Sequence, residues 1–188
     1  VLHVNRLYEE KRIDVLIDAT AKLKSDAHVV LVGTGPLEAK LRAQVERLQL
    51  RERVSFLGFV EDDDLLPLRR SSALFAIPSE ADLQSLATME AMACGLPVVA
   101  ARSYALPELV HHEQNGYLFQ PGDSDELAHD IDLLIENPQL RAQMGAESLV
   151  VIAPHDREKV LDEWEALYMR LTSEFKESSA RKRHFIPM

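Results

Sequence analysis

The fold is decided by residues 73–101, "ALFAIPSEADLQSLATMEAMACGLPVVAA". A short apolar run at 73–78 leads through a polar loop into an apolar helical stretch, and a second apolar run follows at 97–101. Gly95 ends the helical stretch, and Pro97 prevents it from resuming. The stretch therefore predicts a strand, a helix and a second strand that lies parallel to the first.

One carboxylate interrupts this apolar stretch. Glu90 is the only charged residue between Asp82 and Arg102. A carboxylate is costly to bury unless something pairs with it. Two interpretations stay open: Glu90 pairs with an Arg or Lys elsewhere in the fold, or it accepts hydrogen bonds from the two hydroxyls of a ribose.

The same alternation of short and long apolar runs extends outward along the chain. The pattern predicts a Rossmann-like, doubly wound α/β fold, with a parallel sheet of about six strands and helices on both faces. The helix expected at 62–72 contains Pro67, and we expect it to break there. Strands are expected at 1–4, 28–33, 53–58, 73–78, 97–101 and within 116–123, and helices at 14–24, 36–50, 62–72, from Ser85 to Gly95, 124–136, 138–149 and 155–178.

The composition excludes several classes of protein. The 188 residues carry a net charge of −10, which argues against broad binding of nucleic acid. A single cysteine, Cys94, excludes an internal disulfide framework and suits a reducing compartment. No apolar run approaches the roughly 18 residues of a membrane span, and the chain opens inside an apolar strand with no secretory leader. We therefore expect a cytoplasmic protein, and a fragment of a longer chain.

Three polar segments follow predicted strands: "NRLYEEK" (5–11), "GTGP" (33–36) and "PSEADLQS" (78–85). Ligands of doubly wound sheets bind at the carboxyl ends of the strands. Arg6 and Lys11 could hold a pyrophosphate there, and the helix N-terminus near Ser85 offers a second anion site. Solvated loop charges and a capped surface helix are the alternatives.

Two shorter motifs point less clearly to a ligand. "VGTGPLEAK" (32–40) has Glu38 where a dinucleotide fingerprint has its third glycine, so a tight turn is favoured over NAD binding. "EDDD" (61–64) contains a D-x-D sequence, but acidic residues in a first helical turn favour capping over a metal site. No metal ligand is predicted.

Six segments in this order resemble one known family. The chain from about residue 1 to residue 168 resembles the C-terminal, donor-binding half of a family 4 glycosyltransferase with the GT-B fold. Such enzymes move a sugar from a nucleotide diphosphate to an acceptor with retention of anomeric configuration. The segments are "RLYEEKRIDVLIDA" (6–19), "LVGTGP" (31–36), "RVSFLGFV" (53–60), "LFAIPSEADLQSLATMEAMACGLPVVA" (74–100), "LPELV" (106–110) and "NGYLFQPGD" (115–123).

The resemblance assigns the catalytic and ribose-binding roles. Arg6 and Lys11 would hold the donor diphosphate. The E-x7-E motif of the family falls on Asp82 and Glu90, so Asp82 would take hydroxyls of the donor sugar and Glu90 those of the ribose. Asn5 stands where the family has glycine, and Asp82 where it has glutamate; Glu80 could compensate for this shorter side chain.

The resemblance also places the remaining donor contacts. Backbone amides of Gln84, Ser85 and Leu86 would contact sugar and phosphate, although Ser85 replaces a family glycine. The base would lie near Gly58, Phe59 and Val60, and Gly33 would line the cleft.

Residues 1–170 are expected to form the nucleotide-sugar-binding domain, and 171–188 the end of a helix with a basic tail, "ARKRH" (180–184). A UDP-, GDP- or ADP-linked sugar would be the donor, with no further cofactor. The N-terminal acceptor domain would be absent, so this chain alone would transfer nothing. A solvated tail is favoured over contact with the inner face of a membrane. A non-catalytic sugar-nucleotide-binding domain, and half of a GT-B epimerase or phosphorylase, remain alternatives.

Overall fold

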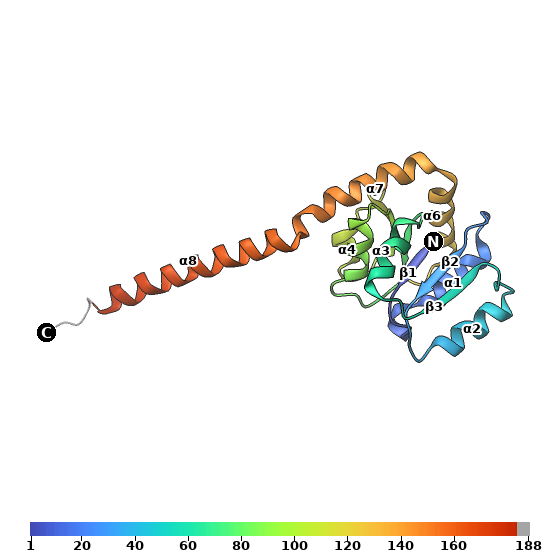
Figure 1. Ribbon diagram of the computed structural model, residues 1–188, viewed down its shortest axis with the longest axis horizontal. Helices are drawn as coiled ribbons and strands as arrows, with labels where there is room; N and C mark the ends of the chain where they lie inside the picture. Colours follow the sequence, from blue (N-terminus) through green and yellow to red (C-terminus); the bar gives the residue numbers. More distant parts are fainter. Residues whose placement is uncertain (184–188) are drawn as a thin grey trace. The chain divides into compact units, whose positions relative to one another are not determined.

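The computed structural model describes residues 1–183, with side chains through residue 175. The chain divides into two compact units, Val1–Ile152 and a second that begins at Ala153. The first unit contains the whole sheet and every residue singled out above as a candidate ligand contact (Figure 1).

The sheet has six strands in the order β3-β2-β1-β4-β5-β6, and every neighbouring pair is parallel. This confirms the predicted Rossmann-like fold. Leu2 of β1 pairs with Val30 of β2 on one side and Phe75 of β4 on the other. The strands are β1 (Leu2–Val4), β2 (Val29–Val32), β3 (Val54–Gly58), β4 (Phe75–Ile77), β5 (Val98–Ala101) and β6 (Gly116–Phe119).

Helices cover both faces of this sheet because the strand order runs outward in two directions from β1 and β4, and right-handed crossovers then fall on opposite faces. One layer contains α1 (Ile13–Lys22), which packs beside α2 (Glu38–Arg47) and α6 (Ser124–Glu136). The other contains α4 (Leu86–Ala93), which packs against α7 (Pro138–Ile152). Strands β4 and β5 are completely buried, which explains their uninterrupted apolar sequences.

The expected break at Pro67 is wrong. Helix α3 (Asp62–Arg70) continues through this residue. Pro67 lies only one turn beyond the helix start, so it removes the hydrogen bond to a single carbonyl, that of Asp63. Asp63 is exposed, and water can take the place of the missing amide.

Three short helices also occur in the described part of the chain. Two are 3₁₀ helices, η1 (Glu9–Lys11) and η2 (Ala153–His155), and α5 (Leu106–Leu109) forms one α-helical turn. The turn η1 follows β1 and places Lys11 beside the carboxyl edge of the sheet.

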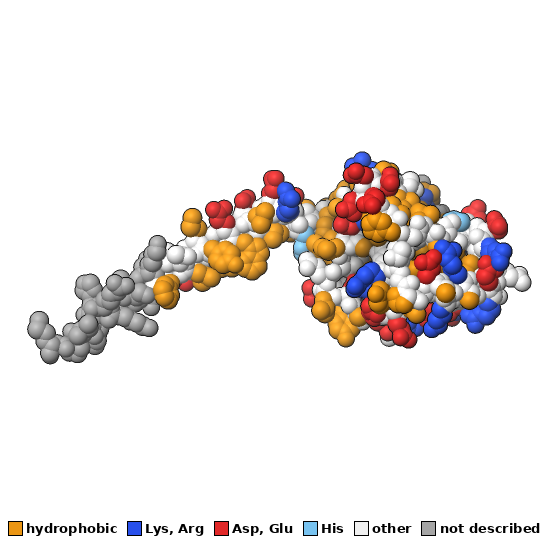
Figure 2. Space-filling view, turned by 60° about the horizontal axis from the view of Figure 1, so that its bottom comes forward, with side chains coloured by type: hydrophobic (Ala, Val, Ile, Leu, Met, Phe, Trp, Pro, Cys, Tyr) orange, Lys and Arg blue, Asp and Glu red, His pale blue; other side chains and the backbone are white. Residues whose placement is uncertain are grey.

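The second unit contains η2 and the helix α8 (Arg157–Arg183). The helix extends past the predicted end at residue 178, so residues 180–183 of the basic cluster are helical; His184 lies outside the described residues. Exposed apolar side chains recur along α8 every three or four residues and form one stripe (Figure 2). They are Leu161, Trp164, Tyr168, Leu171 and Phe175. No helix among the described residues is long and apolar enough to cross a membrane.

Candidate functional site

The point where the strand order reverses lies between β1 and β4. The loops that leave two adjacent strands at such a point diverge to opposite faces of the sheet and leave a crevice between them. The loop after β1 carries Arg6 and Lys11, and the loop after β4 carries Asp82. The structure thus brings together all three residues that the sequence predicted to be catalytic at one edge of the sheet.

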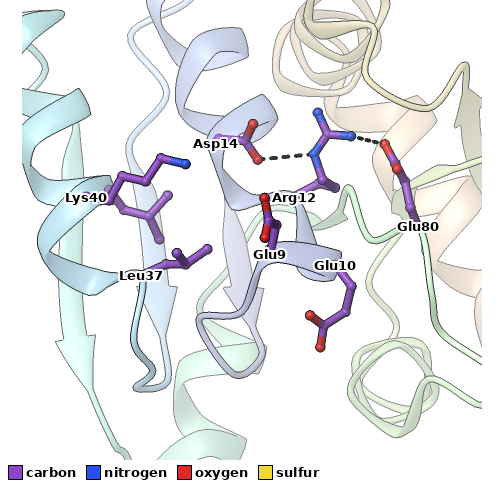
Figure 3. Close-up of a pocket in the computed structure, with 8 residues that line it drawn as sticks. Glu9, Glu10, Arg12, Asp14, Leu37, Lys40 and Glu80 are labelled. Carbon is purple, nitrogen blue, oxygen red and sulfur yellow. Dashed lines mark hydrogen bonds and ion pairs between the residues drawn. The ribbon is translucent and has the colours of Figure 1, made fainter.

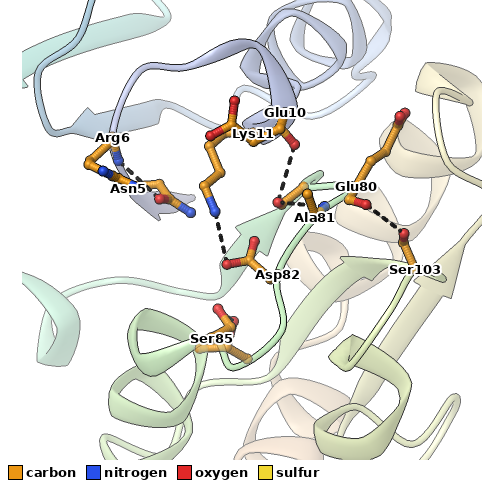
Figure 4. A network of polar contacts seen from close by, with 11 residues as sticks. Asn5, Arg6, Glu10, Lys11, Glu80, Ala81, Asp82, Ser85 and Ser103 are labelled. Atoms are coloured by element: carbon orange, nitrogen blue, oxygen red, sulfur yellow. Dashed lines mark hydrogen bonds and ion pairs between the residues drawn. The ribbon is translucent and has the colours of Figure 1, made fainter.

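Lys11 and Asp82 form a buried ion pair across this crevice (Figure 4). Lys11 Nζ donates to Asp82 Oδ1 over 3.0 Å, and the two side chains are 9% and 10% exposed. Asp82 Oδ2 is also buried, and no described residue donates a hydrogen bond to it. The pair therefore leaves one carboxylate oxygen and two of the three ammonium N–H groups for other partners.

Hydrogen bonds to the backbone join the loop after β4 to the loops after β1 and β5, and Figure 4 shows the bond between Ser103 and Glu80. The carbonyl of Glu10 accepts from the Glu80 amide over 3.0 Å, and the carbonyl of Glu80 accepts from Ser103 Oγ over 3.1 Å. The Ala105 amide donates to the Asp82 carbonyl over 3.2 Å. The loops after β1, β4 and β5 are thereby joined before any ligand arrives.

Arg6 lies at the same edge but is exposed, with its guanidinium 5.2 Å from the centre of the Tyr8 ring. The amide of Arg6 donates to Asn5 Oδ1 over 3.0 Å. Asn5 does not adopt a positive φ, so the backbone here does not need the glycine that the family pattern has. An exposed guanidinium is free to form bidentate contacts with an anion.

Gly33 packs against the backbone at the carboxyl end of β2. Its φ is +127°, and a Cβ atom there would lie 1.9 Å from the Asn5 carbonyl oxygen. Its amide donates to the Gly58 carbonyl over 2.7 Å. The ends of β1, β2 and β3 therefore meet at Gly33, which only glycine can occupy without displacing the loop after β1.

The N-terminus of α4 points into the same region. Ser85 precedes the helix with φ −91°, which any residue can adopt, so its replacement of a family glycine causes no backbone strain. Its hydroxyl lies 2.8 Å from that of Thr88 and does not cap the helix. First-turn amides without a side-chain cap, together with the positive end of the helix dipole, favour an anion here. The neighbouring Gln84 and Leu86 are exposed.

Glu90 does not lie in a buried environment, contrary to the expectation from its apolar neighbours. Its side chain is 54% exposed, and Glu90 Oε2 accepts from Nη2 of Arg69, a buried residue of α3. The structure therefore contains the ion pair, one of the two open interpretations. It also leaves more than half of the Glu90 side chain exposed, so a ribose contact is compatible with it.

The sequence analysis did not identify Arg69 as the partner of Glu90, although the pattern of α3 indicated that Arg69 is buried. Leu65 and Arg69 are four residues apart, and both are buried. Positions i and i+4 share one face of a helix, so the apolar Leu65 marked the face on which Arg69 lies.

The residues expected near a base follow β3. Gly58 adopts φ +68°, Phe59 is 71% exposed, and Val60 is half-buried. The Gly33–Gly58 hydrogen bond connects this loop to the loop after β2. An exposed aromatic ring at the carboxyl edge can stack on a planar base.

Glu80 does not take the role that its position suggested, because its carboxylate forms an ion pair with Arg12 (Figure 3). Arg12 Nε also donates to Asp14 over 3.3 Å. These three residues line a cavity of about 580 Å³, together with Glu9, Glu10, Leu37, Lys40 and Leu41. In this arrangement the Glu80 side chain points away from Asp82 (Figure 4).

His3 lies in β1 and is completely buried. Burial lowers the pKa of His3 to about 4; the hydrogen bond to Ala76 and the charge of Asp82 raise it, and the charge of Lys11 lowers it. The ring is therefore neutral at neutral pH.

Asp62, Asp63 and Asp64 occupy the first turn of α3, where acidic residues complement the helix dipole. Among residues 1–175, no three His, Cys, Asp or Glu side chains gather in a way that could hold a metal ion.

Comparison with known proteins identifies the class of protein that this fold and site define. Residues 1–149 match the model of the family described as "Glycosyl transferases group 1". An uncharacterized glycosyltransferase of Haemophilus influenzae is 32% identical over 171 residues, which cover 89% of this chain and 48% of that protein. The N-acetyl-alpha-D-glucosaminyl L-malate synthase of Bacillus anthracis is 31% identical, with 89% and 44% covered.

A solved structure is also similar to this chain. The crystal structure of Anabaena HepE in complex with UDP is similar with a TM-score of 0.81 and 34% identity, over 92% of this chain and 48% of that chain. The chain belongs to the glycosyl transferases group 1 family. It spans about half the length of the curated relatives that it matches.

Proposed function

We propose that this chain is the donor-binding half of a family 4, retaining glycosyltransferase, and that it binds a nucleotide-diphosphate sugar at the β1/β4 crevice. The observation that carries the proposal is the buried Lys11–Asp82 pair, which joins a cation and a carboxylate at the position where doubly wound sheets bind ligands. HepE, which is similar to this chain, has been crystallised with UDP and with UDP-glucose. A UDP-linked hexose is therefore the first donor to test, ahead of GDP- and ADP-linked ones.

The diphosphate would lie between two cations and a helix N-terminus. Arg6 offers a bidentate contact, and Lys11 has N–H groups that Asp82 does not use. The amides of Ser85 and Leu86 and the dipole of α4 add positive potential. Negative charge develops on the diphosphate as it leaves, so these groups would stabilise the transition state without requiring a metal ion.

The carboxylates of Asp82 and Glu90 would accept hydrogen bonds from hydroxyl groups of the donor. Asp82 Oδ2 has no donor among the described residues, and a sugar hydroxyl would supply one. Glu90, whose side chain is more than half exposed beside Arg69, would bind the ribose hydroxyls. The backbone of Gly58, Phe59 and Val60 would contact the base, while Gly33 and Gln84 would line the donor cleft.

Asp82 is assigned to sugar binding rather than to nucleophilic attack. Its other oxygen is held by Lys11, which orients the carboxylate. Retention would then follow from attack on the face that the diphosphate leaves, with the ion pair holding the sugar in place. An inverted product anomer from the full-length enzyme would contradict retention, and a covalent bond between Asp82 and the sugar would contradict its assignment to sugar binding.

We expect the activity to need a longer protein, because the chain spans about half the length of its curated relatives and the other half would bind the acceptor. We expect residues 1–188 to bind UDP-glucose weakly and to transfer no sugar. Calorimetry with UDP, GDP and ADP, followed by their glucose conjugates, tests the binding. Binding of none of them would favour a non-catalytic role, and turnover of UDP-glucose to an epimer or a sugar phosphate would favour the epimerase or phosphorylase alternative.

Location in the cytoplasm, with contact at the inner face of a membrane through residues 180–184, remains a proposal. Sedimentation with anionic liposomes, with and without residues 179–188, tests the contact. Equal sedimentation of the two proteins would contradict it.

A further inference from the structure

Tyr8 is an exposed aromatic residue that the proposed donor site does not use. It lies in the loop after β1, two residues beyond Arg6, and is 40% exposed. Leu7, between these two residues, is completely buried, and its amide donates to the Thr34 carbonyl over 3.0 Å. Leu7 thus anchors the loop to the core, while its two neighbours stay at the surface.

Tyr8 contacts both of the cations that would hold the donor diphosphate. The guanidinium carbon of Arg6 lies over the Tyr8 ring, 5.2 Å from its centre, which is within the range of a cation–π interaction. The Tyr8 amide donates to the Arg6 carbonyl over 3.0 Å, and the Tyr8 carbonyl accepts from the Lys11 amide over 3.1 Å. One residue therefore connects the exposed cation of the crevice with the buried one.

The two cations are held by different kinds of partner. Lys11 forms an ion pair with Asp82. Among the residues whose side chains are described, no carboxylate forms an ion pair with Arg6, although Glu9 and Glu10 follow it closely in the chain. A carboxylate would compete with an incoming anion for the guanidinium, whereas a neutral ring attracts the guanidinium without cancelling its charge.

We propose that Tyr8 is a positioning residue of the donor site, whose ring holds the Arg6 guanidinium in place for contact with the donor diphosphate. A long, exposed arginine side chain loses rotamer freedom when it binds an anion, and this loss weakens binding. A contact with the ring that exists before the ligand arrives reduces the freedom that remains to be lost. This inference rests on the proposed function.

Two variants and one double variant separate this role from other uses of Tyr8. Tyr8→Phe keeps the ring and removes only the hydroxyl group, whereas Tyr8→Leu removes the ring and keeps an apolar side chain. Neither variant removes the backbone hydrogen bonds with Arg6 and Lys11. If Tyr8 acts through Arg6, the effect of Tyr8→Leu should disappear in the presence of Arg6→Met, whereas a direct contact between ring and donor would preserve it.

The ligand-free test is NMR of the Arg6 side chain in the 188-residue chain. The ring current of Tyr8 should shift the Cδ proton resonances of Arg6 upfield. Tyr8→Leu should return these resonances to the values of a free arginine side chain, and Tyr8→Phe should preserve the shift. Tyr168→Leu, which removes an exposed tyrosine of α8, is the matched control and should leave the Arg6 resonances unchanged. Arg6 resonances that do not change in Tyr8→Leu would overturn the inference, whether or not the chain binds any nucleotide.

Calorimetry with UDP-glucose tests the functional consequence. Loss of one exposed cation–π contact should weaken binding about fourfold in Tyr8→Leu, and Tyr8→Phe should stay within about twofold of the parent chain. Equal losses in Tyr8→Phe and Tyr8→Leu, or a loss that persists when Arg6→Met is also present, would overturn the positioning role. A parent chain that does not bind UDP-glucose would instead contradict the proposed function, while the NMR result would still decide the contact between Tyr8 and Arg6.

Discussion

Lys11 and Asp82 are 71 residues apart in the chain and meet as buried side chains at the β1/β4 crevice. Removing two charges from water costs free energy that their attraction repays only in part, and apolar residues of similar shape often stabilise a fold as well or better. The pair is therefore poorly explained as a stability device. Binding of a ligand to the remaining Lys11 N–H groups and to Asp82 Oδ2 would explain why a buried ion pair lies here.

Lys11→Met should destabilise the chain and weaken donor binding together. It leaves the Asp82 carboxylate buried without a counterion, which costs about 3 kcal/mol of unfolding free energy. Urea unfolding measures that loss, and UDP-glucose calorimetry measures the affinity. Adding Asp82→Asn to Lys11→Met should recover much of the stability but not the affinity; recovery of both would contradict the assignment.

Glu90→Gln should separate affinity from stability. The amide oxygen of glutamine can still accept from Arg69, so the unfolding free energy should change by about 1 kcal/mol or less. The loss of a charged acceptor for ribose hydroxyls should weaken UDP binding about tenfold. Arg69→Met is the matched control: it should lower stability and spare UDP binding. An unchanged UDP affinity in Glu90→Gln would leave Glu90 as a structural partner only.

The buried His3 should make stability fall as the pH falls. Its folded pKa of about 4 lies below the unfolded value of 6.5, so the unfolded chain takes up a proton first. The contribution of His3 is complete above pH 6.5 and is lost progressively toward pH 4, by roughly 2 kcal/mol between pH 7.5 and pH 5.

Urea unfolding of the parent chain and His3→Phe at both pH values isolates this contribution. Asp130, whose pKa burial raises to about 6, acts in the opposite sense and is present in both proteins. The difference between the two proteins should therefore report on His3. Parallel pH dependences would contradict the buried neutral ring.

At the scale of elements, the sequence was enough to predict the sheet, its parallel strands and the helices on both faces, because fully buried strands and amphipathic helices have distinct periodicities. It did not predict that α3 continues through Pro67, because water can replace the backbone hydrogen bond that this proline removes. It also could not place Glu90, because the exposure of one helix face depends on how α4 packs against α7. The candidate site was predicted by loop position and family resemblance, whereas the His3 environment arises only when β1 and β4 become neighbours.

The junction of three strand ends gives a prediction at this scale. Gly33→Ala should destabilise the chain by roughly 3 kcal/mol, because it combines a positive φ with a clash against the Asn5 carbonyl. Gly122→Ala is the matched control, since Gly122 also has a positive φ, +83°, but open space around it. The control should cost about 1 kcal/mol. Thermal or urea unfolding of both variants checks this, and equal losses would show that the close approach at Gly33 is unimportant.

At the scale of the whole molecule, a chain with a net charge of −10 builds its candidate site around cations. Arg6, Lys11 and the start of α4 place positive groups at one edge of the sheet, although Asp82 balances the charge of Lys11. The assignment of residues 1–170 to donor binding stays a prediction.

The most direct measurement is a crystal structure of this chain with UDP-glucose. We predict the diphosphate between Arg6, Lys11 and the first turn of α4, the ribose at Glu90, and a glucose hydroxyl on Asp82 Oδ2. A nucleotide bound elsewhere, for example in the cavity that Arg12 and Glu80 line, or a ribose that makes no contact with Glu90, would contradict the assignment of the donor site.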